Sequence, residues 1–151
     1  MRAELTSALT PLENLFDAGD GPAMPLPSVL VELYGQLRFP NHAGRPHVYA
    51  NFVSSLDGVV SLSIPGKSGG GPINGPDKHD RLVMGLLRAA AGAVVVGAGT
   101  VREVGRHLWT AAFAYPPLAD AFGEMRAALG LAVHPLNVFV TDSGNLNSGL
   151  E

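Results

Sequence analysis

Residues 76–103, PDKHDRLVMGLLRAAAGAVVVGAGTVRE, decide the fold class. The first half of this stretch repeats apolar residues at helical spacing, and two aspartates stand near its start, where the helix dipole favours negative charge. Pro76 suits the first helical position, and Gly92 suits the position just beyond a helix end. The stretch therefore predicts a helix that begins at Pro76 and ends before Gly92.

The second half of the stretch changes from helical spacing to a continuous apolar run, AVVVGAG, over residues 93–99. Such a run is typical of a strand that is covered on both faces. A helix that leads into a buried strand and then into Gly-x-Gly indicates an α/β fold with a largely parallel sheet. Thr100 and Glu103 have the spacing of a capping box, which predicts that a short helix starts at Thr100.

The flanking sequence supplies further elements of both kinds. SVLVELYGQL (28–37) predicts a short helix with Ser28 as its N-cap, and PPLADAFGEMRAALG (116–130) predicts another helix. HVYANFVSS (47–55) alternates as a half-buried strand does, and NVFVT (137–141) is a second short β run. Polar turn residues then follow with no element to close the sheet edge, so we expect the alternation of helix and strand to stop in mid-pattern.

Composition narrows the class of protein. The chain has 151 residues, 46% hydrophobic and 15% charged, which favours one globular domain. A net charge of −3 with scattered basic residues gives no support for nucleic-acid binding. The absence of cysteine excludes disulfides and thiolate metal sites, and the five histidines lack the close pairing of metal ligands. With no secretory signal and no membrane-length apolar run, we expect a cytoplasmic, metal-free protein.

The glycine-rich stretch GAGTVRE (97–103) has two interpretations. Its glycines and the free amides after Thr100 suit a phosphate group, with Arg102 as an added contact, but they also suit a tight strand-to-helix turn. A Rossmann site is not indicated, because Arg102 occupies the third glycine position. GKS at 66–68 lacks the preceding glycine of a P-loop, since that position is Ser61, and is better explained as a flexible loop.

Several polar or aromatic residues remain open to a bland interpretation when each is taken alone. Asp57-Gly58 suits a hairpin turn, and Arg88 lies off the apolar stripe of its helix, as a solvated residue would. Trp109 can pack in the core or stack on a ligand. His79 and His107 are expected to face solvent.

Taken together, VYANFVSSLDG (48–58), INGPDKHDRLVMGLLRAAAGAVVVGAGTVR (73–102) and their separation resemble the RibD C-terminal reductase family. The resemblance covers about residues 28–145 and implies the α/β fold of dihydrofolate reductase, a three-layer sandwich with a mostly parallel central sheet. The family domain continues beyond the part that this chain resembles, so we expect a fold truncated at the C-terminus. Residues 1–44 would be a lead-in segment with a short helix, and 45–151 the N-terminal part of the reductase domain.

The resemblance implies a pyrimidine reductase of riboflavin biosynthesis that uses NADPH. The family reduces 5-amino-6-(5-phosphoribosylamino)uracil at the sugar C1, which gives the ribitylamino product, and tends to form homodimers. Two alternatives stay open. One is an incomplete or inactive domain that needs a partner or a missing C-terminal part, and the other is a related pterin or dihydrofolate reductase.

Matching positions carry the family's site residues onto this chain. Asp57 would be the catalytic residue, either as a proton donor or as a group that orients the pyrimidine. The substrate would contact Ser55, Asp57, Arg88 and Leu108. The resemblance assigns NADPH contacts to Asn51, Gly58, Gly97, Ala98, Gly99, Thr100, Val101, Arg102, Thr141 and Ser143.

Overall fold

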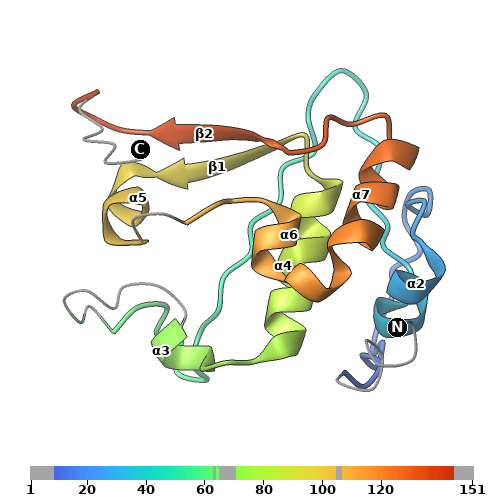
Figure 1. Ribbon diagram of the computed structural model, residues 1–151, viewed down its shortest axis with the longest axis horizontal. Helices are drawn as coiled ribbons and strands as arrows, with labels where there is room; N and C mark the ends of the chain where they lie inside the picture. The colour runs from blue at the N-terminus through green and yellow to red at the C-terminus, as the bar shows by residue number, and fades with distance from the viewer. Residues whose placement is uncertain (1–8, 63, 65–70, 105–106, 145–151) are drawn as a thin grey trace.

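The structure is a computed structural model that describes residues 9–62, 64, 71–104 and 107–144. Within these ranges the chain is a mixed α/β protein whose two strands pair in parallel (Figure 1). The GKS motif and most of the glycine-dense loop after Pro65 lie outside the described residues. In chain order the elements are α2 (Ser28–Tyr34), α3 (Gly71–Asn74), α4 (Lys78–Ala90), β1 (Ala93–Gly97), α5 (Ala98–Val104), α6 (Ala111–Ala114), the 3₁₀ helix η1 (Pro116–Leu118), α7 (Ala119–Ala128) and β2 (Leu136–Val140).

Helix α4 confirms the helix predicted from residue 76, with a shifted start. Asp77 is the N-cap, and its carboxylate accepts a 2.8 Å hydrogen bond from the amide of Asp80. Pro76 therefore precedes the N-cap and is not the first helical residue. The aspartate takes the N-cap position because its carboxylate can accept a hydrogen bond from a first-turn amide, which a proline side chain cannot do. The helix ends at Ala90, and Ala91 is already extended, so only Ala91 and Gly92 separate α4 from β1.

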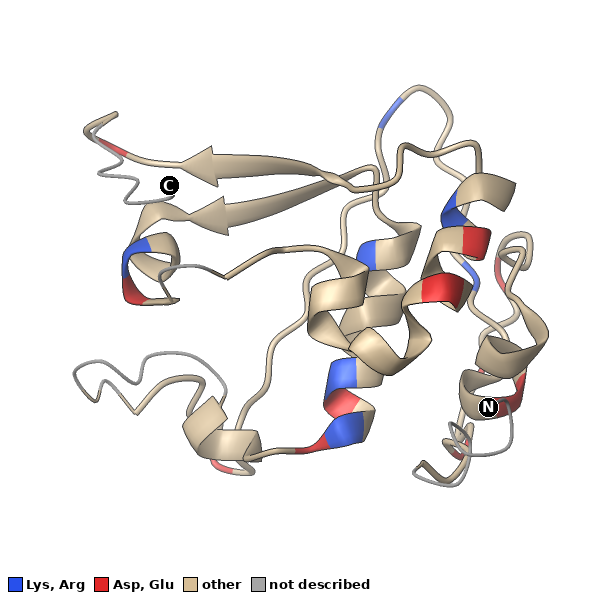
Figure 2. Cartoon of the chain, in the orientation of Figure 1, with Lys and Arg blue, Asp and Glu red and all other residues tan. Residues whose placement is uncertain are grey.

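The predicted β runs pair in parallel, with Ala93 beside Leu136 at one end of the ladder and Gly97 beside Val140 at the other. The prediction that the strand at residues 93–99 is covered on both faces is wrong. Val96 faces the packed side, whereas Val95 is 66% exposed and Val140 is 58% exposed. Alternate strand residues point to opposite faces, and within the described residues the packing around Val96 covers only one of them. Figure 2 shows no charged residue on either strand, and the exposed face carries the apolar side chains of Val95, Leu136 and Val140.

The strand predicted over residues 47–55 is wrong. This segment is described throughout and pairs with no strand among the described residues. Tyr49 instead stacks on Phe39 with ring centroids 4.9 Å apart, and its hydroxyl donates a 2.6 Å hydrogen bond to the carbonyl of Leu87 in α4. Val48 and Phe52 stay 83% and 78% exposed. Side-chain contacts of the tyrosine thus replace the backbone ladder that the alternation predicted.

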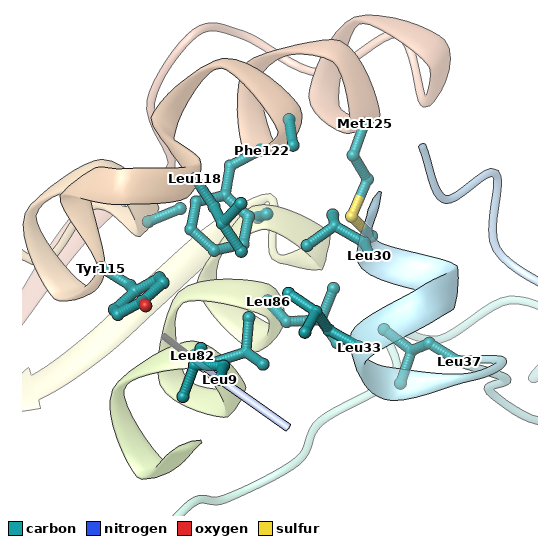
Figure 3. Close-up of a cluster of buried hydrophobic side chains, with 13 residues drawn as sticks. Leu9, Leu30, Leu33, Leu37, Leu82, Leu86, Tyr115, Leu118, Phe122 and Met125 are labelled. Carbon is teal, nitrogen blue, oxygen red and sulfur yellow. The ribbon is translucent and has the colours of Figure 1, made fainter. Parts of the chain in front are cut away.

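The main core forms where α2, α4 and α7 meet (Figure 3). Leu30 of α2, Leu86 of α4 and Phe122 of α7 are each at most 1% exposed. Helix α2 confirms the short helix predicted from residue 28, although Pro27 is its N-cap and Ser28 is its first helical residue. Proline with φ near −55° is already set for a helix start, which explains the shift. The lead-in segment therefore supplies part of the core.

Helix α7 confirms the predicted helix at 116–130, preceded by η1 and followed by Gly130 at φ 66°. One buried residue on this helix is charged. Arg126 is 3% exposed, and its guanidinium donates to the carbonyls of Ala89 at 3.0 Å and Ala91 at 2.7 Å, at the end of α4. Its Nε donates at 2.7 Å to the carbonyl of Ala132, shortly before β2. Burial lowers the pKa of Arg126, but the guanidinium keeps its positive charge, which the C-terminal end of a helix favours.

None of the described helices is long and apolar enough to cross a membrane.

His79 does not face solvent freely, since its Nε2 lies 2.9 Å from the carbonyl oxygen of Thr10. Helix α3 is a single turn that has no buried residue.

Candidate functional site

Two of the segments that the resemblance assigns to NADPH meet at one edge of the sheet. Gly97 is the last residue of β1 and pairs with Val140, the last residue of β2. Because the strands are parallel, the residues that follow them, Ala98 and Thr141, leave from the same edge (Figure 1). In α/β sheets this carboxyl edge is where ligands bind.

Helix α5 begins at Ala98, not at Thr100 as the capping-box spacing predicted. The chain passes from strand to helix without a linker, so Thr100 lies inside the first turn and cannot cap it. The amides left without helical partners are therefore those at the start of α5, Ala98 to Thr100, and not those after Thr100.

The glycines at this edge leave room beside the backbone. Gly97 and Gly99 are exposed, and a Cβ built on either would meet no atom of the described residues within 4 Å. Thr100 and Arg102 are exposed too, whereas Ala98 and Val101 are 5% and 7% exposed. A ligand at this edge can therefore reach the side chains of the exposed residues but only the backbone of the buried ones.

Thr141 carries an unusual polar atom. Its Oγ1 is buried and has no hydrogen-bond partner among the described residues. A buried hydroxyl without a partner costs about 1–3 kcal/mol. A bound molecule that supplied a donor or acceptor would remove this cost. Ser143, two residues further on, is exposed.

A second group of predicted residues forms around Arg88 on α4. Its Nη1 lies 3.5 Å from the carbonyl oxygens of Leu108 and Thr110, and Leu108 itself is 56% exposed. Burial lowers the pKa of Arg88, although a guanidinium remains charged at neutral pH. Among the described residues no carboxylate lies within 4.0 Å of it. Arg88 is thus a half-buried positive charge without a counterion in this part of the chain.

The expectation that His107 faces solvent is wrong. Its Nε2 lies 3.4 Å and 3.5 Å from the two terminal nitrogens of Arg88. Burial, and after it the charge of Arg88, lowers the pKa of His107. No local pattern marks this histidine, because its partner stands 19 residues away on α4.

Trp109 packs in the core, which settles its two interpretations. It is 6% exposed, and its ring lies 5.0 Å from that of His107 and 5.5 Å from that of Phe139 on β2. Val96 and Val101 are the other buried residues of this second cluster. The Arg88 group and the strand edge are therefore joined by one packed layer of side chains.

Residues 55–59 form a tight turn. The amide of Gly58 donates to the carbonyl of Ser55 at 2.9 Å, and Gly58 has a φ of 87°, which favours glycine. The Ser55 hydroxyl donates to Asp57 Oδ1 and accepts at 3.1 Å from the amide of Val59. Chiefly because of the Ser55 hydroxyl, the pKa of Asp57 is lowered, so this exposed carboxylate is ionised at neutral pH.

The contacts of the described residues bring together only part of the predicted site. Arg88 and Leu108 touch, and the aromatic layer connects them to the edge that holds Gly97–Arg102 and Thr141. The hydrogen bonds of Ser55 and Asp57 stay within their own turn, and Asn51 is exposed in the unpaired segment before it. These contacts therefore join the Arg88 group to the strand edge, and the 55–59 turn is not part of that connection.

An open pocket of about 420 Å³ lies elsewhere, lined by His42, Arg45, Pro46 and Val48. It includes none of the residues that the sequence marks as functional, and its lining is at or near the surface. The strand edge remains the better candidate.

Comparison with known proteins agrees with the resemblance carried by the sequence blocks. The family model of the RibD C-terminal domain matches residues 46–148. No curated protein and no solved structure matches the chain. The matched range spans most of the chain and includes the strand edge, Arg88, His107 and the 55–59 turn. The chain therefore belongs to the RibD C-terminal domain family, a family of reductase-type domains of riboflavin biosynthesis.

Proposed function

We propose that the chain is an NADPH-dependent reductase that acts on 5-amino-6-(5-phosphoribosylamino)uracil and folds as part of a dihydrofolate reductase-like sandwich. The observation that carries this proposal is the carboxyl edge of β1 and β2. Open glycine backbone lies there beside the hydroxyl of Thr141, which has no partner among the described residues. Membership of the family supplies the reaction class.

The residues at the strand edge fit NADPH in chemical terms. Gly97 and Gly99 let a large group approach the backbone, and the amides of the first α5 turn are donors for phosphate oxygens. Thr141 and Ser143 would lie toward the 2′-phosphate, with Arg102 as a nearby positive charge. When bound, NADPH supplies the hydride that reduces the sugar C1.

The Arg88 region fits the phosphorylated substrate. A half-buried guanidinium with no carboxylate neighbour among the described residues is suited to a phosphate group, with which it makes strong bidentate hydrogen bonds. Leu108 offers an exposed apolar side chain beside it. Asp57 is ionised, so its role would be to accept hydrogen bonds from the pyrimidine N–H groups and not to donate a proton. This role requires the 55–59 turn to approach Arg88 when substrate binds.

Calorimetric titration with NADPH tests the cofactor site, and loss of NADPH absorbance with the phosphoribosylamino substrate tests turnover. We expect micromolar affinity for NADPH and weaker binding of NADH, which lacks the 2′-phosphate. A folded protein that binds neither nucleotide would contradict the proposal. Turnover of a pterin or of dihydrofolate, with none of the pyrimidine, would favour a related reductase.

One observation favours a second candidate, a reductase-like domain that a partner completes. The outward face of the sheet is apolar, with Val95, Leu136 and Val140 each more than half exposed. Exposed apolar sheet faces and open strand edges are typical of surfaces that another chain covers. Sedimentation equilibrium decides between an unpaired chain of 15.7 kDa and a homodimer of twice this mass. A monomer that binds NADPH and turns over substrate would rule this candidate out.

A further inference from the structure

The contact between Arg88 and His107 defines the protonation state of the histidine. Both terminal nitrogens of Arg88 face His107 Nε2, at 3.4 Å and 3.5 Å. A guanidinium has only donors, so Nε2 must offer its lone pair. The contact therefore fits a neutral ring that carries its proton on Nδ1.

The ring of His107 is held in place by its neighbours. The ring centroid of Trp109 lies 5.0 Å from that of His107, and the ring of Phe113 meets it edge-on with centroids 4.6 Å apart. Phe113 and Leu108 are 43% and 56% exposed, so solvent reaches the surroundings of the ring. Arg88 and His107 thus form a fixed, half-buried polar pair that a small anion can reach.

We propose that His107 is a second ligand, beside Arg88, for a dianionic phosphate group, and that anion binding adds a proton to His107 Nε2. The anion would displace the long contact between the two side chains, and each would then donate to one of its oxygens. The inference deepens the proposed function, since it rests on Arg88 as an anion-binding residue and names the substrate group that it holds.

The surrounding charges agree with this coupling. Among the described residues, Arg88 is the charged group that faces His107 from α4, and α6 presents no titratable residue. Burial and Arg88 both disfavour the imidazolium in the free protein. A dianion in contact with both groups offsets the repulsion between Arg88 and a protonated His107. The affinity for the anion should therefore rise as pH falls from about 8 to about 6, across the range in which histidine titrates.

The probe is inorganic sulfate, which stays dianionic over this range, so any proton taken up belongs to the protein. Calorimetry in two buffers of different ionisation enthalpy should show uptake of up to about one proton per sulfate near pH 7. For His107→Gln we expect about three- to tenfold weaker binding near pH 6 and no pH dependence. Arg88→Ala should lose binding, and His134→Gln, which alters an exposed loop histidine, should match the wild type.

Sulfate affinity and proton uptake that are the same in His107→Gln as in the wild type would overturn the proposal. Should that variant not fold, the Cε1 proton resonance of His107 in the wild-type chain decides, because protonation on sulfate addition shifts it and a purely structural role does not. Ribose 5-phosphate should bind as sulfate does if the site serves a sugar phosphate. Sulfate binding with these properties in a chain without NADPH turnover would leave this inference standing and contradict the reductase assignment alone.

Discussion

The guanidinium of Arg126 donates a 3.2 Å hydrogen bond to the backbone carbonyl of Arg88. The same side chain reaches the carbonyls of Ala89 and Ala91, and through its Nε that of Ala132. One buried residue thus closes the end of α4 just before β1 and fixes the loop that leads into β2. Since the amide of Leu136 donates to the carbonyl of Gly92, the sheet begins directly beside this contact.

Arg126→Met should therefore destabilise the protein by about 3 kcal/mol, because several buried carbonyls lose their donor. Arg126→Lys should recover part of this loss, since an ammonium keeps the charge but not the planar set of donors. Urea unfolding of both variants measures the effect. A loss below about 0.5 kcal/mol for Arg126→Met, the range of ordinary surface substitutions, would show that the contact does not stabilise the fold.

Gly85→Ala tests the approach of α4 to α7. A Cβ at this position would stand 2.7 Å from the ring of Phe122, which is 1% exposed and cannot easily move. We expect a loss of about 1–3 kcal/mol from overpacking, measured by urea unfolding. Gly123→Ala is the matched control, because it lies inside α7 with no atom within 4 Å of a built Cβ. It should stabilise the protein by about 0.5–1 kcal/mol, and equal effects at both sites would contradict the packing.

The elements that the sequence predicts well are those whose own residues determine them. Helix α4 has an apolar stripe and a capping aspartate within its own stretch, and α7 likewise has its stripe and Gly130. The segment 47–55 has equally clear alternation, but a strand also needs a partner edge, which lies elsewhere in the chain. Tyr49 bonds to Leu87 on α4 instead, and no local pattern could indicate that contact.

For the candidate site, the glycine-rich turn and the end of β2 could be brought together from the sequence, since parallel strands share a carboxyl edge. Two polar residues were not identified. Arg126 stands four residues after Phe122 on the buried stripe of α7, so its spacing did carry a signal. His107 carried none, because its position follows from packing against Trp109 and Arg88.

The stability of the protein should depend on pH through His107. Its pKa is lowered in the folded chain, so the unfolded chain binds the proton more readily. The free energy of unfolding should stay level above about pH 7 and fall as pH drops below the ordinary histidine value of about 6.5. His107→Gln should flatten this slope in urea titrations at several pH values, and His134→Gln should not. Equal slopes in all three proteins would show that His107 titrates normally.

Asp57→Asn separates the turn from the proposed chemistry. The Ser55 hydroxyl can still donate to an amide oxygen, so the turn and the fold should persist. NADPH affinity should be unchanged, while turnover should fall at least about tenfold because an ionised acceptor is lost. Steady-state kinetics and NADPH titration measure the two effects. Wild-type turnover in this variant would leave Asp57 with a role in the turn only.

Thr141→Val replaces the unpartnered hydroxyl with a methyl group of similar size. Because Oγ1 has no partner among the described residues, unfolding in the absence of ligand should show a chain that is as stable as the wild type or about 1 kcal/mol more stable. NADPH affinity should fall by about three- to tenfold if the hydroxyl bonds to the bound cofactor. We therefore expect the free energy of unfolding to stay level or rise in this variant while its affinity for NADPH falls.

Thr110→Val provides the comparison for that substitution. Thr110 is the N-cap of α6, where its hydroxyl accepts a 3.2 Å hydrogen bond from the amide of Phe113. Its loss should destabilise the protein by about 1 kcal/mol and leave NADPH affinity within error of the wild type. A Thr141→Val chain that is less stable and binds NADPH normally would mean that its hydroxyl has a structural partner, and that the strand edge is not the cofactor site.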